Sequence, residues 1–322
     1  MAAKSVQKLD PQSTRGLSVS KAHIVAIGGG KGGIGKSFIS SSLSIFFANM
    51  GLRTILVDLD LGAANAHTVL GETQPKVGLS DYVNSETKEL IDVAVPTRFA
   101  NLRLIAGAND SLDMADLDED HRSRLMSAIY NLDADCVVLD LSAGTHSTTL
   151  DFFLMAQDKI VTMTPDPSSI ENGYRLMKAA FFRRLKRFEH QLELSKEIED
   201  AMKRSAELGI KSPGDLLAHI NKQDPKKGAD LLERMQKLEF SILLNQARNQ
   251  KDSEIGISVK SITQRYFGLP ASFVGAVDYE NTVWQALRKK KHLIMDSPMS
   301  SLYSQLLTIS RDLVQKHKRR VK

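Results

Sequence analysis

The chain contains a single cysteine, a single tryptophan and no run of 18 consecutive apolar residues. One cysteine excludes a disulfide framework and a cysteine-rich metal cluster, and the apolar neighbours of Cys136 indicate a core position. Without a long apolar run, no helix is expected to span a membrane. Residues 1–20 also lack the apolar segment of a secretory signal, so we expect a flexible N-terminal tail and a cytoplasmic protein.

The remaining composition is that of a globular protein with one large domain or two smaller ones, with 42% hydrophobic and 25% charged residues. The net charge of +5 comes with basic runs at 183–187, 288–292 and 316–320. Such runs can bind the phosphates of lipids or nucleic acids. The alternative is that they are solvated helix ends, because cations stabilise the C-terminal end of a helix.

A glycine-rich segment at 28–37 matches the phosphate-binding pattern G-x-x-x-x-G-K-S. A predicted strand precedes it and a predicted helix follows, which is the setting that the pattern requires. Backbone N–H groups of such a loop surround an anion, Lys36 reaches the β- and γ-phosphates, and Ser37 offers a hydroxyl to Mg²⁺. The predicted nucleotide-binding residues of the loop are Gly30, Gly32, Gly33, Ile34, Gly35, Lys36, Ser37 and Phe38.

Acidic residues end two further predicted strands. Asp58 and Asp60 lie two positions apart, so alternation sends both side chains to one side of the strand end. Asp140 follows four apolar residues, a pattern in which the acid holds Mg²⁺. Asp58 and Asp60 would repel one another if buried side by side, so they need Mg²⁺, a lysine or water nearby, and the loop supplies all three. Ser37 and Asp140 are expected at the magnesium site.

Short apolar runs alternate with helical patterns along the chain, which predicts an α/β fold with a mainly parallel sheet and helices on both faces. The stretch from about 183 to 237 lacks a strand and reads as an insertion of three helices. Gly209 is expected to end the first, and the N-cap residues before Pro213 and Pro225 to begin the others. The predicted strands are 23–28, 54–59, 102–106, 136–141, 159–164, 240–245 and 272–277.

With its second lysine, the loop reads K-G-G-I-G-K-S and resembles the deviant Walker A group of P-loop NTPases, the MinD/ParA family. The segment 58–65, which ends at Asn65, resembles the FlhG/FleN flagellar regulators more than the DNA-partition ParA proteins. The resemblance implies that Lys31 reaches the nucleotide of a partner subunit and that Asp60 positions the attacking water. It also implies that Asp58 orders the Mg²⁺ shell and that Gly144 senses the γ-phosphate.

Late strands are expected to supply recognition of the base. Asn245 ends one strand and carries an amide that can pair with an adenine edge. Asp278 lies in a loop that resembles the family's base-packing loop. Trp284 is expected in the core rather than on the base. The resemblance covers about 22–182 and 238–315, so the insertion and the N-terminal tail lie outside it.

These features predict a P-loop ATPase domain over 21–315 that binds ATP and Mg²⁺, forms an ATP-dependent homodimer and separates on hydrolysis. The resemblance implies weak intrinsic turnover, a protein partner that stimulates it, and control of the placement or number of a flagellum or of the division site. One alternative is a ParA-like partition ATPase that binds DNA without sequence preference. Another is a nucleotide-binding scaffold that does not hydrolyse usefully.

The C-terminus predicts a helix whose apolar face, from Met299 to Leu313, docks on the sheet, followed by a basic tail at 316–322. Basic residues next to an apolar face favour an anionic membrane surface, so the protein is also expected at the inner face of the cell membrane. We expect weak, salt-sensitive and ATP-enhanced liposome binding, which deletion of 316–322 reduces without unfolding the protein.

Overall fold

The computed structural model describes residues 22–62, 64–85, 88–107, 117–289, 292 and 300–321. The tail expected at 1–20 and Met299 lie outside these residues. Among the described residues, no helix combines the length and the hydrophobicity needed to cross a bilayer.

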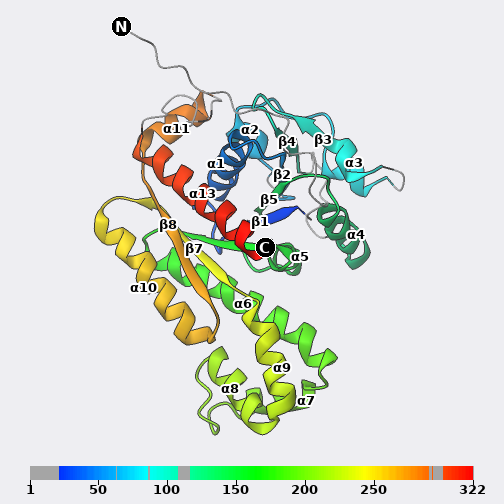
Figure 1. Cartoon of the computed structure of the whole chain (residues 1–322), viewed down its shortest axis with the longest axis vertical. Coiled ribbons are helices and arrows are strands. Elements are labelled where there is room, and N and C mark those ends of the chain that lie inside the picture. Colours follow the sequence, from blue (N-terminus) through cyan, green and yellow to red (C-terminus); the bar gives the residue numbers. More distant parts are fainter. Residues whose placement is uncertain are drawn as a thin grey trace.

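One eight-stranded sheet forms the centre of the molecule, in the order β3-β4-β2-β5-β1-β6-β7-β8 (Figure 1). All neighbouring strands are parallel except β3, which is antiparallel to β4 at one edge. The predicted α/β class is therefore confirmed, and the predicted strands agree with the observed ones within two residues at each end. The strands are β1 (His23–Gly28), β2 (Thr54–Leu59), β3 (Ala94–Pro96), β4 (Leu102–Ile105), β5 (Cys136–Leu141), β6 (Asp158–Met163), β7 (Phe240–Ala247) and β8 (Ala271–Asp278).

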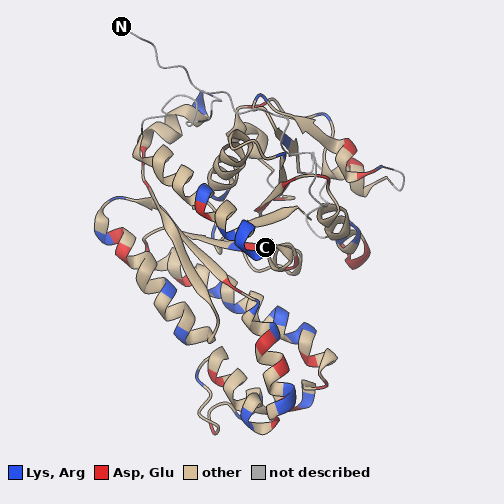
Figure 2. Cartoon of the chain, viewed as in Figure 1, with Lys and Arg blue, Asp and Glu red and all other residues tan. Residues whose placement is uncertain are grey.

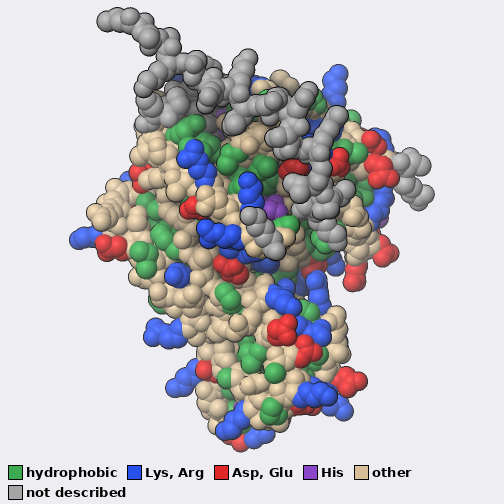
Figure 3. Space-filling model, in the orientation of Figure 1, with side chains coloured by type: hydrophobic (Ala, Val, Ile, Leu, Met, Phe, Trp, Pro, Cys, Tyr) green, Lys and Arg blue, Asp and Glu red, His purple; other side chains and the backbone are tan. Residues whose placement is uncertain are grey.

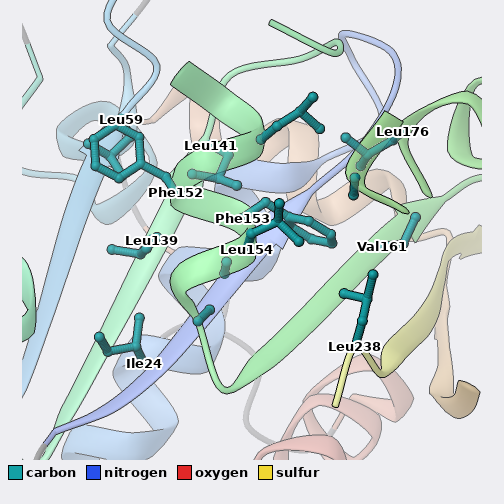
Figure 4. Packing of buried hydrophobic residues seen from close by; sticks show 14 of the residues in the cluster. Ile24, Leu59, Leu139, Leu141, Phe152, Phe153, Leu154, Val161, Leu176 and Leu238 are labelled. Atoms are coloured by element: carbon teal, nitrogen blue, oxygen red, sulfur yellow. The ribbon is translucent and has the colours of Figure 1, made fainter. Parts of the chain in front are cut away.

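Helices cover both faces of the sheet, as its fully buried central strands require. On one face the apolar core is shared by α1 (Lys36–Asn49), α2 (Ala66–Leu70), α11 (Asn281–Arg288) and α13 (Ser301–Val321). On the other it is shared by α3 (Leu79–Val83), α4 (Glu119–Tyr130), α5 (Ser147–Met155), α6 (Pro167–Gln191) and α10 (Gln250–Phe267). Phe152 and Phe153 of α5 lie among strand residues in this second core (Figure 4). A short 3₁₀ helix, η1 (Leu90–Val93), leads into β3.

A helical lobe projects from the sheet at 183–237 (Figure 1). It contains the second half of α6 with α7 (Ser195–Lys203), α8 (Pro213–Gln223) and α9 (Pro225–Gln236). Both predicted helix starts are confirmed, because Ser212 and Asp224 cap α8 and α9 with side-chain oxygens. The single helix expected to end at Gly209 is wrong. The chain breaks at Glu193, whose φ of 53° is left-handed, so α6 and α7 are separate.

The expectation of a basic tail separate from the helix is also wrong, because the basic residues from 316 onward continue α13 to Val321. Its apolar face docks as predicted, with Leu302 and Leu306 buried. Beyond that face, Lys316 and Arg320 each form ion pairs with both Asp158 and Glu239. Lysine and arginine residues gather where α13 ends (Figure 2), and basic side chains lie on this face of the molecule (Figure 3). Part of this basic charge is therefore used to fix the helix to the protein.

Candidate nucleotide-binding site

The glycine loop joins the end of β1 to the start of α1 at the carboxyl edge of the sheet, where ligands bind in open α/β folds. Gly33 and Gly35 have φ values of 77° and 87°, a left-handed backbone that glycine adopts without strain. Lys36 is the first residue of α1 and is only 7% exposed. Burial lowers the pKa of its ammonium group, and the carboxylates of Asp140 and Asp60 act in the opposite direction.

Two neighbouring segments hold this loop in place. The amide of Asn245, at the end of β7, donates a hydrogen bond from Nδ2 to the carbonyl of Ile34 at 2.8 Å. The N–H of Gly144 donates to the carbonyl of Gly29 at 3.2 Å. Asn245 and Gly144 therefore lie beside the loop. Their expected contacts, with the base and with the γ-phosphate, remain predictions.

Asp58 and Asp140 lie side by side, because they are partners in the parallel register of β2 and β5. Each is only 1% exposed. Asp58 accepts hydrogen bonds from the N–H groups of Asp60 at 3.1 Å and Ala66 at 2.9 Å. Burial, followed by the charge of Asp140, raises the pKa of Asp58 to about 7. Burial also raises the pKa of Asp140 to about 6, against the opposing influence of Ser37 and Lys36.

The Asp140 carboxyl fits a divalent cation. Within the described part of the chain, neither of its oxygens has a donor at hydrogen-bonding geometry, although Ser37 and Lys36 are close enough to affect its pKa. The described residues hold no cluster of three or more His, Cys, Asp or Glu side chains suited to a metal. Mg²⁺ commonly takes one or two carboxylates and completes its shell with phosphate oxygens and water. The residues present therefore fit Mg²⁺ bound together with a nucleotide, and Ser37, Asp58 and Asp140 would hold it.

Lys31 lies on the exposed side of the loop. Its Nζ donates a hydrogen bond to Ser168 Oγ at 3.0 Å, and Ser168 in turn donates to Asp166 at 2.9 Å. Both residues belong to the turn that begins α6. Lys31 thus contacts its own chain here, and its role across a dimer interface remains a prediction.

Next to the loop, a cavity of about 500 Å³ opens between α1, the ends of β7 and β8, and α11. Asn245 and Asp278 line it, and their expected role in base recognition remains a prediction. The Asp278 carboxylate also accepts a hydrogen bond from Ser301 Oγ at 3.0 Å, so it fixes the start of α13. Asn65 is exposed before α2 and is not among the cavity residues.

The core position expected for Trp284 is wrong. Its side chain is 57% exposed and lines the same cavity. Sequence reasoning also missed Tyr279 and Gln246, which line this cavity. Gln246 has a φ of 61°, a left-handed backbone that is uncommon outside glycine. No periodic pattern marks these residues: Gln246 is near the end of β7, Tyr279 follows β8 and Trp284 is a lone aromatic residue on α11.

Comparisons with known proteins agree with this geometry. Residues 25–294 match the family model described as the CobQ/CobB/MinD/ParA nucleotide binding domain, and the chain belongs to this family. Members of the MinD/ParA group are P-loop ATPases. The chain is 25% identical over 285 residues to the antiactivator FleN of Pseudomonas aeruginosa, which covers 88% of this chain and 83% of FleN.

MinD proteins are similar over a shorter region. The septum site-determining protein MinD of Helicobacter pylori is 30% identical over 157 residues, which is 48% of this chain and 58% of that protein. The structure of MinD from Pyrococcus horikoshii complexed with Mg-ADP matches with a TM-score of 0.60 and 17% identity, covering 91% of this chain and 96% of that one. MinD of Pyrococcus furiosus matches with a TM-score of 0.62 and 17% identity, covering 92% and 99%. These structures show the fold, and the predicted family is confirmed.

Proposed function

We propose that this protein is an ATP-dependent dimerising switch that hydrolyses ATP to ADP and phosphate. The observation that supports this most directly is the juxtaposition of Lys36 with the buried carboxyl pair Asp58 and Asp140 at a glycine loop. Each charge is costly to bury alone. Together they suit a ligand that brings both anionic phosphates and a divalent cation.

The residues have separate roles in this proposal. N–H groups of the loop and Lys36 Nζ bind the phosphates, and Lys36 stabilises the charge that develops on the leaving group. Ser37 and Asp140 would hold Mg²⁺, and Asp58 would help to hold it by ordering its shell. Bound Mg²⁺ neutralises phosphate charge. Asp60, half-buried after β2, orients the attacking water.

Dimerisation depends on Lys31 in this scheme. Its bond to Ser168 is on an exposed surface and is therefore weak, so exchange for a phosphate of the partner subunit's ATP is energetically accessible. Hydrolysis removes that phosphate and releases the dimer. A partner protein that completes the site would accelerate the slow intrinsic reaction.

Similarity to FleN and to MinD supports control of the placement or number of a cellular structure, a flagellum or the division site. Two of the basic runs that could bind DNA or lipid are partly occupied by carboxylates. Arg183 forms a bidentate pair with Asp151, with both distances 2.6 Å, and Lys316 pairs with Asp158 at 3.2 Å. A ParA-like DNA surface therefore gains no support from these runs. Peripheral binding to an anionic membrane would depend on the remaining exposed cations.

Two variants test the proposal. Asp60→Ala should bind ATP, dimerise and hardly hydrolyse, because losing a water-positioning group slows the chemistry without removing ground-state contacts. Lys31→Ala should bind ATP and stay monomeric. Lys251→Ala, which removes an exposed lysine on α10, is the matched control and should behave as wild type. Analytical ultracentrifugation with ATP and a phosphate-release assay measure both properties; normal dimerisation of Lys31→Ala would reject the proposed interface.

A further inference from the structure

We propose that Trp284 stacks on the base of the nucleotide held at the glycine loop and so makes binding depend on an aromatic base. This inference rests on the proposed function, because it requires nucleotide at that loop. It goes further by naming the group that recognises the base.

The exposure of Trp284 is the first observation. Tryptophan side chains are highly buried on average, yet this one is 57% exposed. Its helix does have an apolar face, since Ala286 is buried and Val283 and Leu287 pack against the core. Trp284 is therefore not part of that core, although the other face of α11 packs against it.

Continuity with the phosphate site is the second observation. Gly33 and Gly35 of the loop line the same cavity as Trp284. Its volume of about 500 Å³ lies within the usual range of small-molecule sites. A nucleotide whose phosphates bind the loop would thus place its remaining atoms in a space that one large aromatic side chain borders.

A contact of the indole ring with an arginine side chain is the third observation. The guanidinium of Arg288, one helical turn away, lies 4.6 Å from the ring centroid. Such a contact restrains the ring by a cation–π interaction on one face, and an aromatic ligand can stack on the other. The Asn245 amide, on the same cavity, adds a group that can hydrogen-bond to a base edge.

Because the chain has a single tryptophan, its intrinsic fluorescence reports on this position alone. Mg-ADP should change the emission in a saturable way. Magnesium tripolyphosphate, which has phosphates but no base, should bind without an equivalent change. An equal change with both ligands would overturn the stacking.

Affinity measurements on variants complete the test. Stacking on a base is worth a factor of about 5 to 150, so Trp284→Ala should weaken Mg-ADP binding by that factor and leave tripolyphosphate binding unchanged in calorimetry. Trp284→Phe should keep most of the affinity. The matched control is Tyr130→Ala, which removes an exposed aromatic ring on α4.

The outcomes separate the two proposals. Unchanged Mg-ADP affinity in Trp284→Ala, or equal weakening of Mg-ADP and tripolyphosphate, would overturn the role of the indole while leaving the phosphate site intact. If wild type binds neither ligand, the proposed function fails and this inference fails with it.

Discussion

Replacing Asp140 by Asn should stabilise the protein in the absence of nucleotide. Asp58 and Asp140 are adjacent and buried, and the ammonium group of Lys36 lies near Asp140. At neutral pH at least one of them is ionised in a site that disfavours the charge. Asn keeps the shape of the side chain and removes one of the two charges.

The size of the effect follows from the pKa. A carboxyl whose pKa rises from 3.8 to about 6 on folding costs about 3 kcal/mol when it is fully ionised. Burying the Asn amide costs about 1 kcal/mol, which leaves a gain of about 2 kcal/mol and a Tm increase of about 4 °C. The raised pKa means that the folded chain binds more protons than the unfolded chain between the two values. Wild-type stability therefore falls as pH rises through this window.

Urea unfolding at about pH 8 and about pH 5 checks this expectation. The gain of Asp140→Asn should be clear at the higher pH and smaller by about 1.4 kcal/mol at the lower one, which lies between the two pKa values, so that about half of the cost remains there. Glu254→Gln, at an exposed position on α10, is the control for loss of a negative charge. With Mg-ADP the order should reverse, because ligand binding stabilises wild type more. A gain of equal size at both pH values would refute the electrostatic reasoning.

Three further outcomes are expected. Lys36→Ala should abolish binding of Mg-ADP in calorimetry, because it removes the charge that faces the β-phosphate; unchanged affinity would refute the phosphate site. Asn245→Ala should weaken tripolyphosphate as well as Mg-ADP, because its amide fixes the carbonyl of Ile34; a loss confined to Mg-ADP would assign it to the base alone. Lys316→Met should lower the free energy of unfolding by about 1 kcal/mol, because it weakens the charge compensation of Asp158; wild-type stability in urea would contradict that.

The ion pairs of Lys316 also change an expectation from the sequence, namely that deletion of 316–322 weakens liposome binding without unfolding the protein. Removing 316–322 takes away Lys316 and Arg320, which pair with the buried Asp158 carboxylate. Burial opposes ionisation of this group, but His23, Lys316 and Arg320 together hold its pKa well below the usual range. A stability measurement must therefore accompany any membrane assay of that deletion.

Much of the phosphate side of the site could be predicted, because its residues stand at fixed spacings along single segments. The loop from Gly30 to Ser37 and the acids at the ends of β2 and β5 are local patterns, and parallel pairing brings them together. The central strands could also be predicted, because both faces of the sheet are buried there and the strand sequences are therefore continuous apolar runs.

Features that depend on long-range contacts were not predictable in this way. Strand β3 has three residues, ends in Pro96 and exists through its pairing with β4. The left-handed Glu193 interrupts a periodic apolar pattern that continues on both sides of it. Whether Trp284 faces the core or a cavity depends on the packing of α11, and a lone aromatic residue carries no periodicity to reveal this.

Helix α6 gives the molecule a long rigid axis. Its 25 residues span about 37 Å at 1.5 Å per residue, from the turn that contacts Lys31 to the far lobe. Near its start, the backbone of Asn172 lies so close to Gly30 that an added Cβ would be 2.0 Å from the Asn172 carbonyl oxygen. A rotation of about 5° about this first turn would displace the other end by about 3 Å. A small rotation of α6 beside the phosphate loop would therefore move its far end, which leads into α7, by about the distance between two contacting side chains.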